Sequence, residues 1–180
     1  FSPAQRKLYD IVLAAQEAAI AATRPGRRFM EPHDAAVRVL AQGMLEVGLL
    51  DRKKHGRLDD VIASGAYRQF YMHRTGHWLG MDVHDCGSYV EPTELGQVSE
   101  RKDPLSGETL VNRPSRILQP GMVLTIEPGL YVRPADGVPE AFWNIGIRIE
   151  DDAIVTSDGC ELITRGVPVV ADEIEALMRG

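Results

Sequence analysis

The stretch IGIRIE, residues 145–150, indicates the class of fold. Its isoleucines alternate with Gly, Arg and Glu, and this period of two predicts a β-strand with one apolar and one polar face. Arg148 and Glu150 therefore share the polar face of the predicted strand. A plain interpretation of the two side chains is a neighbouring ion pair, which contributes about 0.5 kcal/mol when it is exposed.

Further strands are predicted on both sides of this stretch. Downstream, apolar runs at 153–156 and 160–163 are separated by Asp158-Gly159, a tight-turn signal, which favours an antiparallel arrangement. Asp151-Asp152 is assigned to a turn rather than to ligands. Upstream, the run at 122–126 is β-compatible, and Glu127-Pro128-Gly129 interrupts it.

Helices are predicted in the first third of the chain and at its end. Ser2, Pro3 and Gln5 form a helix-start signal with a capping box, and apolar residues then recur at helical spacing as far as residue 23. A second helix is predicted from Pro32 to a terminating Gly48, a shorter one over 57–70, and a last one around 174–178. Residues 88–117 show no period and are expected to form a long surface loop.

Composition restricts the classes of partner. The chain has 180 residues, 44% apolar and 26% charged, and its net charge of −6 argues against a nucleic-acid surface or a polybasic membrane contact. No stretch approaches the about 20 apolar residues of a membrane span. Cys86 and Cys160 show no CxxC spacing, which favours a reducing compartment, the cytoplasm, with a disulfide between them as the alternative. We expect peptides or small molecules as partners.

Three of the five histidines, His73, His77 and His84, fall within twelve residues. Neutral imidazole is a common hydrogen-bonded core or surface group, and it is also a metal ligand and an acid–base catalyst. The HExxH motif of zinc proteases is absent. The glycines and the tryptophan that flank these histidines predict closely packed strands or a turn that would hold the imidazoles rigidly.

Two glutamates lie at the ends of predicted strands. Glu127 closes an apolar strand before Pro-Gly, where a buried carboxylate requires a cation or hydrogen-bond donors, whereas at an exposed strand end it would simply enter solvent. Glu150 follows a similar pattern. One imidazole with two carboxylates is a ligand set that favours Mn²⁺, Co²⁺ or Zn²⁺ over a thiolate-bound structural zinc. Spacing alone does not show that His77, Glu127 and Glu150 meet.

Three segments in order resemble the signature blocks of a known enzyme family. They are YMHRTGHWLGMDVHDCG (71–87), LQPGMVLTIEPGLYV (118–132) and NIGIRIEDD (144–152). They are similar to those of Xaa-Pro aminopeptidases, the aminopeptidase P branch of the pita-bread metallopeptidases, which also include methionine aminopeptidase and prolidase. The resemblance extends over nearly the whole chain. It implies an α+β pita-bread fold, in which helices flank a curved antiparallel sheet.

The resemblance also implies a site with two divalent metal ions, held by two aspartates, one histidine and two glutamates. By motif position, His77 would be the histidine ligand, Glu127 a ligand beside the attacking water, and Glu150 the glutamate that bridges both ions. Manganese is the ion we expect, with cobalt and zinc as alternatives. Two ions can orient the substrate and stabilise the developing oxyanion, while Glu127 acts as general base.

Further roles follow from the same motif positions. His84 matches a histidine that hydrogen-bonds the scissile carbonyl, and His73 matches one that lines the site near the substrate proline, so both are candidate catalytic and substrate-binding residues. Arg148 and Tyr131 are expected to bind substrate or to line the rim of the site. Arg148 and Asp82 are also expected to orient the metal ligands.

The two aspartate ligands of the family have no counterpart in these 180 residues. In the family they precede the helix that begins here at Ser2, and neither Asp59-Asp60 nor Asp82 and Asp85 lie in the matching motif. We therefore expect residues 1–180 to be the C-terminal part of a catalytic domain, without its first strands and without the N-terminal domain of many relatives. A homo-oligomer is expected for the full-length protein.

The function predicted from the sequence is hydrolysis of the N-terminal Xaa-Pro bond of peptides whose second residue is proline. An Xaa-Pro dipeptidase is the nearest alternative, because it uses the same metal ligands and differs mainly in how it receives the far end of the substrate. A pita-bread module that binds peptides or proteins without catalysis is the alternative from another class. Retention of His77, Glu127 and Glu150 argues against that module.

Overall fold

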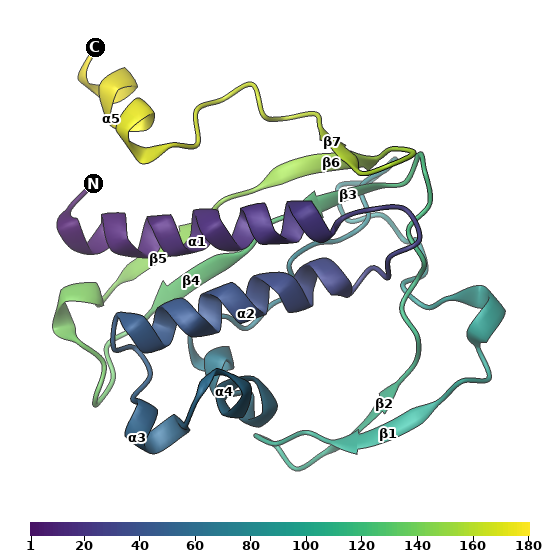
Figure 1. Ribbon diagram of the computed structural model, residues 1–180, viewed down its shortest axis with the longest axis horizontal. Coiled ribbons are helices and arrows are strands. Elements are labelled where there is room, and N and C mark those ends of the chain that lie inside the picture. Colours follow the sequence, from purple (N-terminus) through teal and green to yellow (C-terminus); the bar gives the residue numbers. More distant parts are fainter.

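Two long helices lie side by side across one face of an antiparallel sheet in the computed structural model, which describes residues 1–180 (Figure 1). Helix α1 spans Pro3–Ala22 and begins with the predicted capping box at Ser2. Helix α2 spans Glu31–Glu46, and Gly48 follows with a φ of +77°, a conformation that glycine adopts without strain. The two predicted helices are confirmed.

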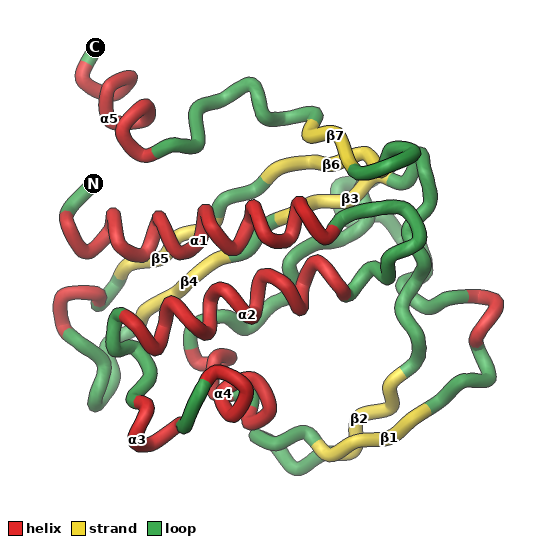
Figure 2. The backbone as a smooth tube through the Cα atoms, in the orientation of Figure 1, coloured by secondary structure: helices red, strands yellow, loops and turns green.

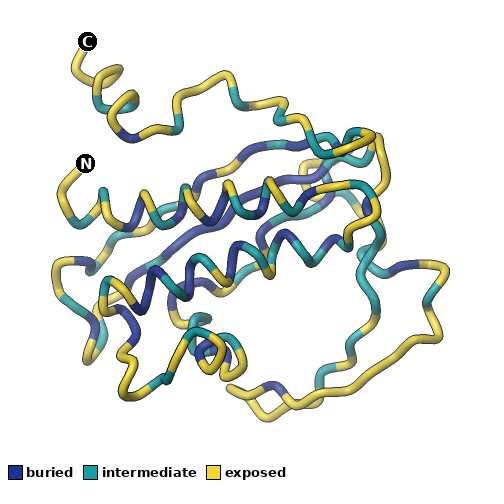
Figure 3. Tube along the Cα trace, in the orientation of Figure 1, coloured by how far each residue is buried: buried dark blue, intermediate teal, exposed yellow.

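The core lies between these helices and the sheet, as the burial pattern shows (Figure 3). Leu8, Val12, Ala15 and Ala19 of α1 are completely buried, which is the face predicted from their spacing. Helix α2 contributes Leu40, Ala41 and Met44 to the same apolar cluster. The sheet is therefore covered on the helical side, and its other face is left to carry polar side chains.

The sheet is built around two long chain segments, each interrupted once. The first comprises β3 (Val123–Ile126) and β4 (Gly129–Val132), and the second comprises β5 (Ile145–Arg148) and β6 (Asp151–Val155). They run antiparallel, with Ile126 opposite Asp151 and Gly129 opposite Arg148, so the two interruptions face each other. Pro128 has no N–H to donate, which explains why the first segment is interrupted there.

Two more segments complete this sheet. Strand β7 (Cys160–Leu162) pairs with β6 across the predicted Asp158-Gly159 turn. On the opposite side, residues 75–79 run along β3, where His77 O accepts from Thr125 N–H at 3.0 Å and Thr75 O accepts from Glu127 N–H at 2.6 Å. The segment that contains His77 is therefore the direct neighbour of the strand that ends at Glu127.

Residues 88–117 contain more structure than the sequence predicts. They form a projecting hairpin of β1 (Ser99–Lys102) and β2 (Thr109–Asn112), preceded by a 3₁₀ turn at Pro92–Glu94 (Figure 2). Both strands are short and mainly exposed, so they lack the apolar alternation by which strands are predicted from sequence. The expectation of a long loop with little structure is corrected on this point.

Hydrogen bonds join the two ends of the segment that carries the hairpin, and ion pairs connect this segment to the rest of the protein. At the base, Glu91 N–H donates to Pro114 O at 3.0 Å and Arg116 N–H donates to Tyr89 O at 2.8 Å. The buried Glu91 carboxylate also accepts from Ile117 N–H at 2.9 Å. Two ion pairs hold the hairpin further out: Arg28 with Glu94 and Arg68 with Asp103.

The remaining helices are short. Helices α3 (Arg52–His55) and α4 (Leu58–Ser64), followed by a 3₁₀ turn at Ala66–Gln69, occupy the region of the predicted third helix. The predicted C-terminal helix is α5 (Ala171–Arg179), and a further 3₁₀ turn spans Glu140–Phe142. None of the helices is both long enough and apolar enough to cross a membrane. The α+β architecture, with helices flanking an antiparallel sheet, is as predicted.

One prediction about individual residues is wrong, and one alternative is ruled out. Asp151 and Asp152 begin strand β6 instead of forming a turn. Asp151 is 2% exposed, and hydrogen bonds from Thr164 and Arg165 offset the cost of burying its carboxylate. The alternative of a disulfide is also excluded, since Cys86 and Cys160 are both free thiols.

Candidate metal centre

His77, Glu127 and Glu150 come together where the sheet is interrupted. One ligand atom from each lies within 4.8 Å of those from the other two. Glu127 follows β3, Glu150 precedes β6 on the paired segment, and His77 comes from the neighbouring strand-like segment. The strand interruptions therefore place two carboxylates and an imidazole at one point on the polar face.

The His77 ring is oriented for ligation. Its Nδ1 lies 2.9 Å from the carbonyl oxygen of Trp78, which can only accept a hydrogen bond, so Nδ1 carries the proton. Its Nε2 lies 3.4 Å from Glu127 Oε1 and is the nitrogen that carries the lone pair in the neutral ring. Fixing the tautomer through a backbone carbonyl is the usual way in which a protein orients a metal-binding histidine.

Glu127 is buried and held at both carboxylate oxygens. Its Oε1 accepts from the Thr125 hydroxyl at 3.1 Å, and its Oε2 accepts from Arg148 Nη1 at 3.4 Å. The same Thr125 oxygen accepts from His77 N–H at 3.1 Å. Thr125 therefore connects two candidate ligands, a role that we did not predict although Thr125 lies two residues before Glu127 on the same strand face.

Glu150 lies at the open side of the cluster. Partial burial, and then the negative charge of Glu127, raise the pKa of its carboxyl group. A divalent cation between the two carboxylates would remove this repulsion. An imidazole with a free Nε2 and two close carboxylates therefore fit the nitrogen and oxygen chemistry of a first-row divalent ion.

A second group of predicted residues forms a hydrogen-bonded chain beside the cluster. The Tyr131 hydroxyl lies 2.8 Å from His73 Nε2 and accepts from Arg148 Nε at 2.6 Å. Arg148 also reaches Glu127, so His73, Tyr131 and Arg148 are linked to a candidate ligand. Arg148 and Glu150 face the same side, as predicted, but Arg148 pairs with Glu127 rather than with Glu150.

His84 and Asp82 lie on the exposed loop that follows Leu79. The His84 ring is 4.3 Å from that of His77 between centroids, which keeps it next to the candidate ligands. The Asp82 carboxylate makes no hydrogen bond or ion pair, so the prediction that it orients a metal ligand is not supported by any contact.

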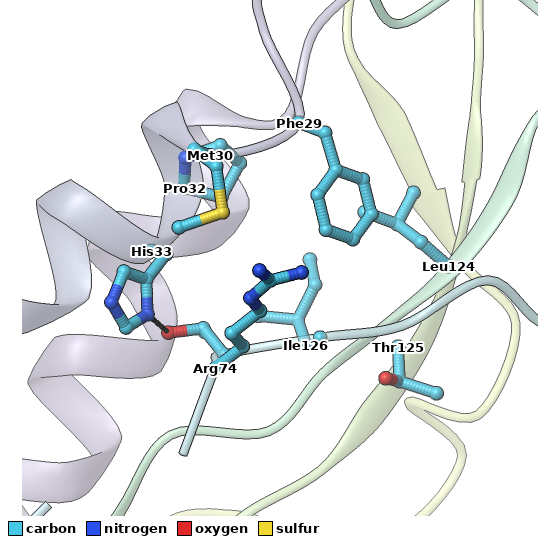
Figure 4. A pocket seen from close by; sticks show the side chains of 10 residues that line it. Phe29, Met30, Pro32, His33, Arg74, Leu124, Thr125 and Ile126 are labelled. Carbon is cyan, nitrogen blue, oxygen red and sulfur yellow. Dashed lines mark hydrogen bonds between the residues drawn. The ribbon is translucent and has the colours of Figure 1, made fainter. Parts of the chain in front are cut away.

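A small cavity lies between β3, the neighbouring residues 74–76 and the start of α2 (Figure 4). Its volume of about 10 Å³ leaves room for one water molecule and none for a peptide. His33 Nδ1 lies 3.0 Å from the Thr75 hydroxyl at its edge, and burial lowers the pKa of His33 to about 4, so this imidazole is neutral. Gly76 belongs to the same wall, and a Cβ there would lie 2.0 Å from Thr125 O.

Comparison with protein families identifies the chain. The sequence pattern of metallopeptidase family M24 matches residues 1–157. The chain belongs to metallopeptidase family M24. The candidate cluster lies within the matched residues, and the fold is the pita-bread fold of this family, as the resemblance implied.

Individual M24 relatives align with nearly the whole of this chain, whereas this chain aligns with only part of each relative. The chain is 43% identical to the Xaa-Pro aminopeptidase of Escherichia coli K12 over 99% of its own length and 35% of that protein. It is 36% identical to human Xaa-Pro dipeptidase, covering 37% of that protein. The structure of Pseudomonas aeruginosa aminopeptidase PepP matches with a TM-score of 0.83 and 46% identity, over 99% of this chain and 35% of that one. The chain thus spans about a third of the length of these relatives.

Proposed function

We propose that the full-length protein is a metal-dependent aminopeptidase that hydrolyses the N-terminal Xaa-Pro bond of peptides. The observation that carries the proposal is the juxtaposition of His77, Glu127 and Glu150 at two facing strand interruptions in an M24 chain. The names of its bacterial relatives, Xaa-Pro aminopeptidases at 41–43% identity, support this choice of substrate.

We propose two divalent ions as cofactors, with manganese as the native metal and cobalt or zinc as substitutes. His77, Glu127 and Glu150 would supply three ligands. Two ions need further carboxylates, and no other acidic residue of the chain joins the cluster. We therefore propose that residues 1–180 are part of the catalytic domain and that two aspartates elsewhere in the full-length protein complete the site.

The chain's own side chains are suited to amide hydrolysis. The bound ions would polarise the scissile carbonyl and lower the pKa of the attacking water. Glu127 would take the proton from that water and pass it to the leaving nitrogen, while Thr125 and Arg148 hold its carboxylate in place. The exposed His84 imidazole would donate a hydrogen bond to the carbonyl oxygen as negative charge develops.

The proline side of the substrate would lie beside the linked trio of His73, Tyr131 and Arg148. These side chains hold one another through short hydrogen bonds, so they present a fixed wall. Arg148 would provide a cation for a main-chain carbonyl or a carboxylate of the peptide beyond the proline. A cytoplasmic location and a homo-oligomeric state of the full-length protein are further parts of this proposal.

The test uses the full-length protein, purified, stripped of metal and reloaded with Mn²⁺. We expect it to release the first residue from a proline-second tripeptide such as Ala-Pro-Ala. A Glu127→Gln variant, which keeps the shape of the side chain but removes its basicity, should lower kcat by at least about 100-fold. Metal analysis should give two ions per chain in the wild type.

The same assay separates the alternatives. Human Xaa-Pro dipeptidase is also a relative, so an Xaa-Pro dipeptide is offered beside the tripeptide. Cleavage of the dipeptide alone would replace the aminopeptidase proposal with a dipeptidase. A protein that binds no metal and cleaves neither peptide would instead be a non-catalytic binding module.

A further inference from the structure

A cleft of about 590 Å³ lies between the β1–β2 hairpin and the body of the protein. Leu110, Val111 and Asn112 of the hairpin form one side, and Tyr71 and His73 contribute to the other. This volume is far larger than the water-sized cavity behind β3 and is within the range of small-ligand sites. The ion pair between Arg68 and Asp103 fixes the outer part of the hairpin, so the cleft is formed in advance of binding.

The cleft is positively charged although the chain as a whole carries a net charge of −6. Arg74, Arg101 and Arg113 line it, and none of the three forms an ion pair within the chain. The guanidinium of Arg74 lies over the ring of Tyr89, 5.7 Å from its centroid. Asp34 is the single acidic residue of the lining. Three free guanidinium groups around one hollow are suited to carboxylates.

The cleft begins at the candidate active site. His73 lines it and at the same time bonds to Tyr131, which is linked through Arg148 to Glu127. An aminopeptidase binds the first residue of its substrate at the metal ions, so only the part of the peptide beyond the scissile bond continues outward. A cleft that starts at His73 therefore lies on the path of the leaving peptide.

We propose that this cleft selects peptides that carry acidic side chains after the proline, through Arg74, Arg101 and Arg113. The inference rests on the proposed function and adds a substrate class to it. Arg68 and Arg28 are not part of this selection, because their charges are already neutralised by Asp103 and Glu94.

The experiment compares two peptides on the full-length, metal-loaded protein at low ionic strength. Ala-Pro-Ala-Glu-Asp-Glu-Ala and its isostere Ala-Pro-Ala-Gln-Asn-Gln-Ala, both amidated at the C-terminus, differ only in charge. We expect kcat/KM to be about three- to tenfold higher for the acidic peptide, because several exposed charge pairs act together. The ratio should fall towards one at about 1 M salt, where the Debye length is about 3 Å.

Variants locate the source of the preference. An R74Q/R101Q/R113Q triple variant should bring the ratio of the two kcat/KM values close to one, and R101E/R113E should lower that ratio below its wild-type value. K7Q/K53Q, which removes two exposed positive charges outside the cleft lining, should keep the wild-type ratio.

The outcomes separate this inference from the proposed function. Cleavage of both peptides with equal kcat/KM by the wild type overturns the inference and leaves the proposed function standing. A preference that survives in R74Q/R101Q/R113Q also overturns it. If neither peptide is cleaved, the proposed function fails and the inference fails with it.

Discussion

A single hydroxyl group connects two of the candidate metal ligands, and its removal is the sharpest test of the site. Thr125 is 2% exposed; it donates to Glu127 Oε1 at 3.1 Å and accepts from His77 N–H at 3.1 Å. Thr125→Val replaces the hydroxyl with a methyl group of similar volume. The variant therefore leaves the shape of the strand intact and deprives both ligand residues of a partner.

The size of the effect follows from the two groups left unpaired. A buried donor or acceptor without a partner costs about 1–3 kcal/mol, and the Glu127 carboxylate still has Arg148 on its other oxygen. We expect Thr125→Val to lower the free energy of unfolding by about 2–4 kcal/mol. Loss of a group that orients metal ligands typically weakens metal affinity about 10- to 100-fold, and we expect the same here.

Thr125→Ser is the matched control. It keeps the hydroxyl and loses one methyl group, so it should lower stability by about 1 kcal/mol and leave metal affinity near the wild-type value. The assay is urea unfolding of the metal-free full-length protein, together with calorimetric titration of Mn²⁺. Equal Mn²⁺ affinities in the Val and Ser variants would refute the reasoning, because the hydroxyl would then have no part in orienting His77 and Glu127.

Three further predictions concern the surroundings of the site. Burial lowers the pKa of His33 to about 4, so below about pH 6.5 the unfolded chain takes up a proton that the folded chain does not. The stability that depends on neutral His33 is therefore fully present above about pH 6.5 and falls by up to ~3 kcal/mol as the pH falls towards 4. Urea midpoints measured across this pH range should vary less in His33→Gln than in the wild type. Gly76→Ala should lower stability by about 1–3 kcal/mol in thermal unfolding, because the new Cβ would meet Thr125 O at 2.0 Å; an unchanged Tm would contradict this. Asp151→Asn should lower the free energy of urea unfolding by about 2 kcal/mol, because it removes the charge that neutralises Arg165. The double variant Asp151→Asn/Arg165→Gln should lose less stability than the sum of the losses in the two single variants.

The sequence predicted the elements whose hydrophobic period is clear. The spacing of Leu8, Val12 and Ala15 placed the buried face of α1 correctly, and the alternation in residues 145–150 placed Arg148 and Glu150 on one side. These predictions succeed because burial on one face imposes a period that can be read without the rest of the structure. The spacing of residues did not show that His77, Glu127 and Glu150 meet. Their proximity was implied only by the motif resemblance.

Other features depend on contacts that no local pattern records. Asp151 looks like a turn residue beside another aspartate, but its buried position depends on Arg165, fourteen residues later. The β1–β2 hairpin has little apolar alternation because β1 is exposed throughout and no residue of β2 is fully buried. Asp82 lies in a motif that resembles that of relatives, yet its carboxylate makes no hydrogen bond or ion pair in this chain.

The base of the hairpin has a consequence for how this protein can diversify. Tyr89 and Glu91 are joined by backbone hydrogen bonds to Arg116 and Pro114, so the two ends of the excursion are closed independently of what lies between them. The entropy of closing a loop grows only slowly with its length. Residues 92–113 can therefore be shortened, lengthened or exchanged without shifting the register of the strands that carry His77, Glu127 and Glu150. Evolution, or a protein engineer, can alter this wall of the cleft while the three candidate metal ligands keep their places.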